Sequence, residues 1–176
     1  MPAVFISAGH SHTDPGAVGN GHSEADIVLE FRDLLADALE YHGVDFTRDG
    51  SQGENMPLQF AIKCAKQAGL ALEFHCNAFS KPTASGVETL SASHHRPLCA
   101  EICAVVAEVL EIPNRGPKGE ASGQHSRLGF ISRGGGIIVE LFFISNPRDL
   151  AQYQVFKHQL AGRLAELLVK HTEADV

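Results

Sequence analysis

Short apolar segments alternate with amphipathic segments along the chain, and this alternation constrains the fold more than any other feature. The apolar segments predict strands over residues 3–8, 44–49, 70–76, 86–92, 128–132 and 137–143. The amphipathic segments repeat apolar residues at helical spacing and predict helices over residues 23–42, 58–68, 97–109 and 147–167. Strands alternating with helices favour an α/β fold. We therefore expect a mainly parallel, twisted sheet of about six strands with helices on both faces.

Several residues mark where the predicted helices begin and end. Ser23 can cap the first helix, with Asp26 three residues later, and Gly43 can end it. Asn146 can cap the last helix, with Pro147 in its first position. Residues 111–126, rich in Gly and polar side chains, are expected to form a loop.

Length and charge exclude several classes of protein. The chain has 176 residues without an internal repeat or linker, so residues 1–176 are expected to form a single domain. Its net charge of −7 argues against nucleic acid as a partner, because nucleic-acid binding needs a basic surface. No stretch approaches the roughly 18 apolar residues of a membrane span. No basic residue precedes the short apolar run at the N-terminus, so we expect synthesis in the cytoplasm without a signal peptide. We also expect a monomer.

Cysteine has no catalytic or metal-binding pattern in this chain. The four cysteines form no CxxC pair, which argues against a structural zinc knuckle. We expect them to be small buried side chains.

Two histidines and a glutamate stand where ligands gather in α/β folds. His10 follows the first predicted strand and His75 ends the third, and ligands lie at the carboxyl ends of parallel strands. Glu24 begins the first helix. Each residue has a structural alternative: a loop or core histidine, or an acidic residue placed favourably for the helix dipole. Together, two histidines, one carboxylate and an open fourth position are typical of catalytic zinc.

Glu140 lies inside the most apolar predicted strand, residues 137–143. A buried carboxylate without a partner is costly, so one interpretation is a structural glutamate with a buried partner. The other is a general acid or base whose pKa is tuned by burial and a nearby cation.

Short motifs are spread along nearly the whole chain. In order, they are Gly9-His10, Asp14-Pro15-Gly16-Ala17, Glu24, Thr47-Arg48-Asp49, Phe74-His75-Cys76-Asn77-Ala78, Gly86-Val87-Glu88-Thr89 and Val139 to Pro147. Together they resemble one family, the zinc-dependent N-acetylmuramoyl-L-alanine amidases of the amidase_3 type. The chain departs from the family pattern at Cys76, where a small residue such as Ala is usual. It also departs at Phe143 or Phe142, where Gly is usual.

The resemblance implies roles for particular residues. His10, Glu24 and His75 would bind Zn²⁺, and Glu140 would be the catalytic glutamate. The implied reaction is hydrolysis of the amide between the lactyl group of N-acetylmuramic acid and L-alanine in bacterial peptidoglycan. Substrate-binding residues are expected at Asn77, Glu88 and Arg115. Cys76 should point away from His75 and is not expected to be a ligand.

Other interpretations of the same residues remain open. The segment His10-Ser11-His12-Thr13-Asp14 resembles the start of a metallo-β-lactamase motif, but Pro15 stands where the final histidine is needed. His12 or His22 are alternative ligands. The segment Gly116-Pro117-Lys118-Gly119 lacks the end of a phosphate-binding loop and is interpreted as a surface loop, with a place on the substrate groove as one option. A different class of protein is a catalytically inactive peptidoglycan-binding module on the same fold.

The kind of amidase follows from what the sequence lacks. Residues 111–127 are too short and too rich in Gly and Pro for an inserted helix that blocks the zinc. Without such a helix or a signal, the chain resembles the catalytic domain of a phage endolysin, which acts on the wall after the membrane is permeabilised. No separate cell-wall-binding domain is expected. The alternative is a host autolysin domain.

Overall fold

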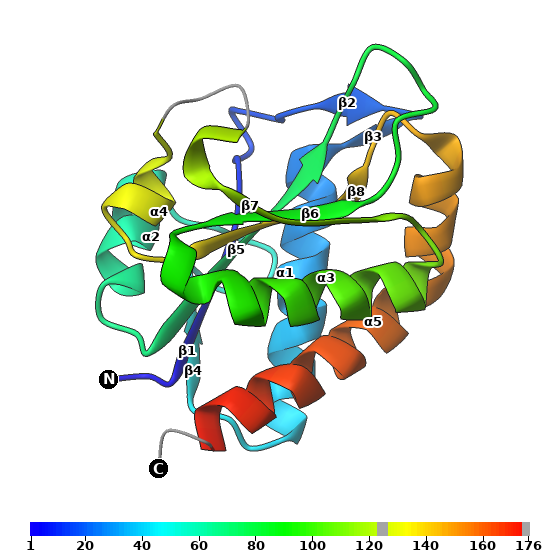
Figure 1. Cartoon of the computed structure of the whole chain (residues 1–176). Coiled ribbons are helices and arrows are strands. Elements are labelled where there is room, and N and C mark those ends of the chain that lie inside the picture. Colours follow the sequence, from blue (N-terminus) through cyan, green and yellow to red (C-terminus); the bar gives the residue numbers. More distant parts are fainter. Residues whose placement is uncertain (123–126, 174–176) are drawn as a thin grey trace.

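The computed structural model describes residues 1–122 and 127–173, and a central sheet with helices on both faces organises this part of the chain (Figure 1). Its six strands lie in the order β4 (Phe46–Arg48), β1 (Val4–Ala8), β5 (Leu70–Asn77), β8 (Ile137–Phe143), β6 (Val87–Ser91) and β7 (Asn114–Gly119). The first four are parallel, whereas β6 and β7 are parallel to each other and β6 is antiparallel to β8. The predicted mainly parallel α/β sheet is confirmed.

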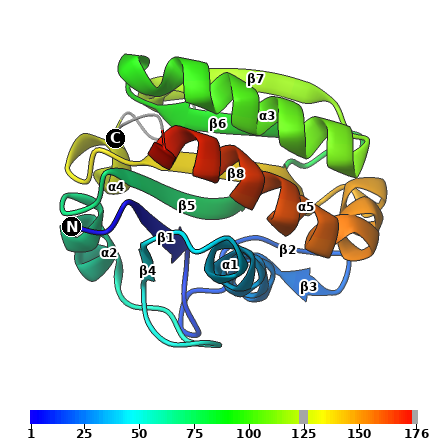
Figure 2. The same cartoon turned by 90° about the horizontal axis from the view of Figure 1, so that it is seen from below.

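The two faces of the sheet differ in what covers them. Three long helices cover one face, α1 (Glu24–Tyr41), α3 (Arg96–Leu110) and α5 (Pro147–Glu173), and α5 packs between the other two (Figure 2). The opposite face packs against two short helices, α2 (Leu58–Ala65) and α4 (Gly129–Ser132). Along β5, Leu72 and Phe74 point into the large core under the long helices. Because side chains alternate in a strand, Glu73 and His75 point to the face with the short helices.

The helix ends follow the predicted caps. The Ser23 hydroxyl accepts a hydrogen bond from the Asp26 amide at the start of α1. Gly43, with a φ of +68°, follows the last turn of that helix. The Asn146 side chain accepts hydrogen bonds from the amides of Arg148 and Asp149 at the start of α5.

Two predicted elements are wrong. Residues 128–132 are not a strand, because α4 begins at Gly129 and buries Phe130 and Ile131. A short apolar run has no periodicity that separates a strand from a helix. The sixth strand is β7 instead, inside the expected loop 111–126, of which residues 123–126 lie outside the described part. At the sheet edge, β7 accommodates Pro117 because only one side of the strand is paired.

A small hairpin leads into α1. Strand β2 (Val18–Gly19) pairs antiparallel with β3 (His22–Ser23) through a turn at Asn20-Gly21. Both turn residues have positive φ, 50° and 81°, as the tight Asn-Gly hairpin turn requires. The hairpin brings the chain directly to Glu24.

Two expectations about composition can be compared with the structure. Cys76, Cys99 and Cys103 are buried and unpaired as expected, whereas Cys64 is partly exposed. In the described residues, no helix has the length and apolar character needed to cross a membrane.

Candidate metal centre

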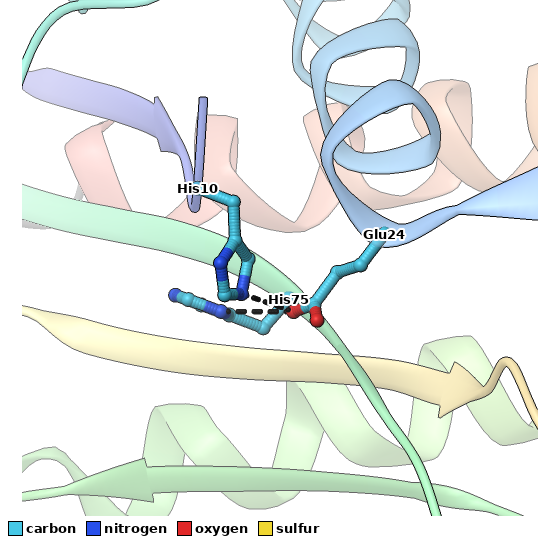
Figure 3. Close-up of side chains that lie close together, drawn as sticks. All are labelled: His10, Glu24 and His75. Carbon is cyan, nitrogen blue, oxygen red and sulfur yellow. Dashed lines mark hydrogen bonds and ion pairs between the residues drawn. The ribbon is translucent and has the colours of Figure 1, made fainter. Parts of the chain in front are cut away.

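The structure brings His10, Glu24 and His75 together at the carboxyl ends of β1 and β5 (Figure 3). One potential ligand atom from each residue lies within 4.8 Å of the others. Glu24 Oε1 accepts hydrogen bonds from His10 Nε2 at 2.9 Å and from His75 Nδ1 at 3.1 Å. These are the three residues that the sequence assigned to the metal.

The backbone near the three side chains has features that leave room for them. His10 has a φ of +64°, a left-handed conformation that few residues other than glycine adopt. A Cβ at Gly9 would lie 2.3 Å from Cε1 of the His75 ring, and a Cβ at Gly16 would lie 2.6 Å from Glu24 Oε2. The two glycines of the motif therefore leave the space that the histidine ring and the carboxylate occupy.

Glu24 is a buried carboxylate whose acceptor sites are filled. Its Oε2 accepts from the Ala17 amide at 3.0 Å, and Oε1 also accepts from the Cys76 amide at 3.0 Å. Cys76 itself belongs to the large core, and the possible metal-binding group of the described residues does not include it. Burial acts against the charged form, but the hydrogen bonds from His10 and His75 outweigh it and hold the pKa of Glu24 well below its usual range.

The two histidines hold protons where a cation would bind. Burial lowers the pKa of His75, but hydrogen bonds to Glu24 and Glu73 outweigh that effect and raise it well above 6.5. The hydrogen bond to Glu24 is the main reason that the pKa of His10 is raised as well. Metal binding would displace these protons. Two imidazoles and one carboxylate around one point fit the donor set of catalytic zinc.

Two further carboxylates lie behind the histidines. His10 Nδ1 donates to Asp14 Oδ2 at 3.1 Å, and His75 Nε2 donates to Glu73 Oε1 at 3.0 Å. Carboxylates in this position orient metal-binding histidines and make them better ligands. Sequence reasoning assigned no role to either residue. The signal was present for Glu73, because a residue two positions before His75 in a strand shares its face.

Glu140 faces the same cavity as the candidate ligands. On β8 it is the register partner of His75 on β5 and of Glu88 on β6. A cavity of about 490 Å³ is lined by Glu140 together with His10, Glu24 and His75. The Oε2 atom of Glu140 is buried without a hydrogen-bond partner in the described part of the chain. The sequence left a partnered structural glutamate as an alternative, and no such partner is found in this part for that oxygen.

The surroundings of Glu140 suit proton transfer. Burial is the largest effect and raises its pKa to about 7, against the opposing charge of His75 and with support from Glu24 and Glu88. A carboxyl group with a pKa near neutrality exchanges protons readily at neutral pH.

The three expected substrate-binding residues form one wall beside Glu140. Asn77 and Glu88 line the cavity, and Asn77 Nδ2 donates to Glu88 Oε1 at 2.8 Å. Arg115 Nε donates to Glu88 Oε2 at 3.0 Å, and its guanidinium lies 5.0 Å from the ring centroid of Phe143. Lys118, from the segment that the sequence offered for the substrate groove, lies on β7 and donates to the same Glu88 oxygen at 2.5 Å. The sequence did not predict this contact.

The remaining alternatives for ligands lie apart from the site. His12 and His22 are exposed, and His22 Nδ1 interacts with the Asn20 carbonyl. Within the described ranges, the possible metal-binding group comprises His10, Glu24 and His75 without either of them. Without His12, the metallo-β-lactamase interpretation has no support.

The two phenylalanines that depart from the family pattern lie outside the cavity. Phe142 packs in the core against Tyr153. Neither Phe142 nor Phe143 lines the cavity.

Comparisons with known proteins give one family. The Amidase_3 family, described as N-acetylmuramoyl-L-alanine amidase, matches residues 4–169. A solved structure from Neisseria meningitidis, provisionally described as an N-acetylmuramoyl-L-alanine amidase, is 36% identical with a TM-score of 0.87, and the match covers 97% of this chain and 95% of the other.

Two Bacillus subtilis proteins are also similar. The uncharacterised protein YqiI is 32% identical over 155 residues, which are 83% of this chain and 72% of YqiI. The N-acetylmuramoyl-L-alanine amidase LytC is 28% identical over 177 residues, covering 96% of this chain but 35% of LytC. The chain thus spans about a third of the length of LytC.

Proposed function

The chain belongs to the Amidase_3 family of N-acetylmuramoyl-L-alanine amidases, and on this premise we propose that it is a zinc-dependent hydrolase of bacterial peptidoglycan. The bond cut is the linear amide between the lactyl group of N-acetylmuramic acid and L-alanine of the stem peptide. One observation carries the proposal: His10, Glu24, His75 and Glu140 converge on a single cavity.

His10, Glu24 and His75 would bind the zinc ion through His10 Nε2, the Glu24 carboxylate and His75 Nδ1, the atoms that face one another in the structure. When bound there, zinc supplies a Lewis acid that polarises a carbonyl and lowers the pKa of water toward about 7.

Glu140 is proposed to move the proton. As general base, its carboxylate accepts a proton from the attacking water, and as general acid it then donates that proton to the leaving nitrogen of L-alanine. The unpaired, buried Oε2 is available for this exchange. Although burial raises its pKa, a cation beside it would favour the charged form that a base needs.

Asn77, Glu88 and Arg115 are proposed to contact the substrate along the wall beside Glu140. Glu88 engages Arg115 through Nε, and the two terminal nitrogens of the guanidinium donate no hydrogen bond within the described residues. Together with Lys118, this wall carries two cations around one carboxylate in a chain whose net charge is −7. The cations of this wall would bind a carboxylate of the stem peptide through charge-assisted hydrogen bonds.

Release of free L-alanyl amino groups from purified peptidoglycan tests this activity. An amidase releases them as the wall dissolves, and no new reducing sugar ends appear. A catalytically inactive binding module would sediment with the wall and release neither.

We also propose a role in lysis, as the catalytic domain of a phage endolysin. The protein would remain in the cytoplasm as a monomer and act on the wall after membrane permeabilisation, with no nucleic-acid partner and no membrane insertion. The described residues between 111 and 122 form β7 and a three-residue 3₁₀ helix, Glu120–Ser122, and this part of the chain holds no long inserted helix, which supports an unblocked site.

Expression with and without a membrane-permeabilising agent tests this role. A lysin held in the cytoplasm clears the culture only after permeabilisation. Lysis without permeabilisation would show that the chain reaches the wall by itself, as a host autolysin domain does, and would contradict this role.

A further inference from the structure

Glu73 is a buried carboxylate fixed at both oxygens directly behind a candidate metal ligand. It is only 5% exposed. Oε1 accepts from His75 Nε2 at 3.0 Å, and Oε2 accepts from the Ser7 hydroxyl at 3.1 Å. Ser7 is the register partner of Glu73 on β1 and is itself 1% exposed. The pairing of β1 with β5 therefore determines where this charge lies.

The contact with Glu73 determines how the His75 ring is used. Because a carboxylate only accepts hydrogen bonds, Nε2 keeps its proton beside Glu73. Nδ1 faces Glu24 at 3.1 Å and is the nitrogen whose proton a metal ion would displace. Gly9 leaves room for the ring in this position, because a Cβ there would approach three ring atoms to 2.3–2.7 Å. His75 is thus presented to the metal through Nδ1.

Asp14 offers a matched comparison within the same site. It accepts from His10 Nδ1 at 3.1 Å, nearly the same distance, but its side chain is 67% exposed. A charge in a low-dielectric interior acts much more strongly than one screened by water. Glu73 and Asp14 thus lie at nearly the same distance from their histidines, but the buried Glu73 should affect metal binding more than the exposed Asp14.

We propose that Glu73 is a positioning residue that sets the zinc affinity of this chain, through both the orientation of His75 and its buried negative charge. The proposal rests on the proposed function, because it takes His10, Glu24 and His75 to be the zinc ligands. Asp14 contributes less, although it contacts His10 in the same way.

Zinc titration of the metal-free protein against a competing chelator measures the effect. Glu73→Gln keeps an acceptor for Nε2 and removes the charge, and we expect it to weaken zinc binding about 10–100-fold. Glu73→Ala removes both and should weaken binding further. Asp14→Asn is the control, with a loss of at most about fivefold, as expected for an exposed pair.

Two further measurements separate positioning from a merely structural role. The Nε2 proton of His75 should give a slowly exchanging NMR signal in the zinc-loaded wild type, and Glu73→Ala should abolish it. Thermal unfolding of the metal-free variants shows whether the fold is retained. If Glu73→Gln does not fold, Ser7→Ala frees one oxygen of Glu73 without touching a ligand and should give a smaller loss of affinity in the same direction.

The outcomes distinguish this inference from its premise. If the wild type binds no zinc, the proposed function fails. If the wild type binds zinc but folded Glu73→Gln binds it equally well, or Asp14→Asn loses as much affinity, the role of Glu73 is refuted and the zinc site stands. If Ser7→Ala is the variant measured, unchanged affinity refutes it in the same way.

Discussion

Replacing Gly9 by alanine tests whether the candidate metal centre depends on the position of the His75 ring. The new Cβ would lie 2.3 Å from Cε1 of His75, whereas ordinary contacts begin at 3.4 Å, so the ring has to move by about 1 Å. Gly9 does not have a positive φ, so alanine adds no backbone strain and the effect falls on the ring. A displacement of about 1 Å at a catalytic centre lowers rates about 100-fold. We therefore expect a loss of that size, with weaker zinc binding.

The assay compares hydrolysis of purified peptidoglycan and zinc affinity for Gly9→Ala and Gly162→Ala. Gly162 lies in α5, where a Cβ would meet nothing within 4 Å, so alanine there should leave activity unchanged. It should also stabilise the helix by about 0.5–1 kcal/mol. If Gly9→Ala binds zinc and hydrolyses the wall like the wild type, the proposed placement of His75 at the metal is wrong.

Two other predictions follow from the charged groups of the site. The raised pKa values of His10 and His75 favour folding below pH 6.5, and this contribution is lost as pH rises through the higher folded-state values. The melting temperature of the chelated protein should therefore fall above pH 6.5, and zinc affinity should rise over the same range; a flat profile in both would contradict this. Arg115→Ala should raise KM for stem-peptide substrates more than it lowers kcat. Arg163→Ala on α5 is the control. An unchanged KM for Arg115→Ala would show that Arg115 does not bind the substrate.

The candidate site was largely predictable because its residues stand at positions with simple geometric meaning. His10 follows β1 and His75 lies near the end of β5, two strands that the apolar pattern identifies, and parallel strands end at one edge. Glu140 interrupts the most apolar strand and therefore stood out. All three lie with Glu24 around one cavity, although their roles there remain a prediction.

What the sequence did not reveal depends on tertiary contacts. Strand β7 (Asn114–Gly119) is an edge strand with neither alternation nor an apolar run, so only its pairing with β6 identifies it. Arg32 would be expected on the solvent side of α1, yet it is fully buried and donates to Asp49 and to carbonyls of the loop after β4. From the same loop, Asn55 donates to the carbonyls of Ala8 and His10. Arg32 thus holds in place the loop that contacts the backbone of His10. Such a long-range contact produces no recognisable pattern in the neighbouring sequence.

The proposed zinc-dependent amidase activity is tested most directly by release of L-alanyl amino groups from purified peptidoglycan, measured after chelation and after return of one equivalent of zinc. The wild type should lose activity in chelator and recover it with zinc. Glu140→Gln should bind zinc as the wild type does, yet release amino groups at least about 100-fold more slowly. Hydrolysis at the untreated rate in chelator would contradict the metal centre, and wild-type hydrolysis by Glu140→Gln would contradict the assigned base.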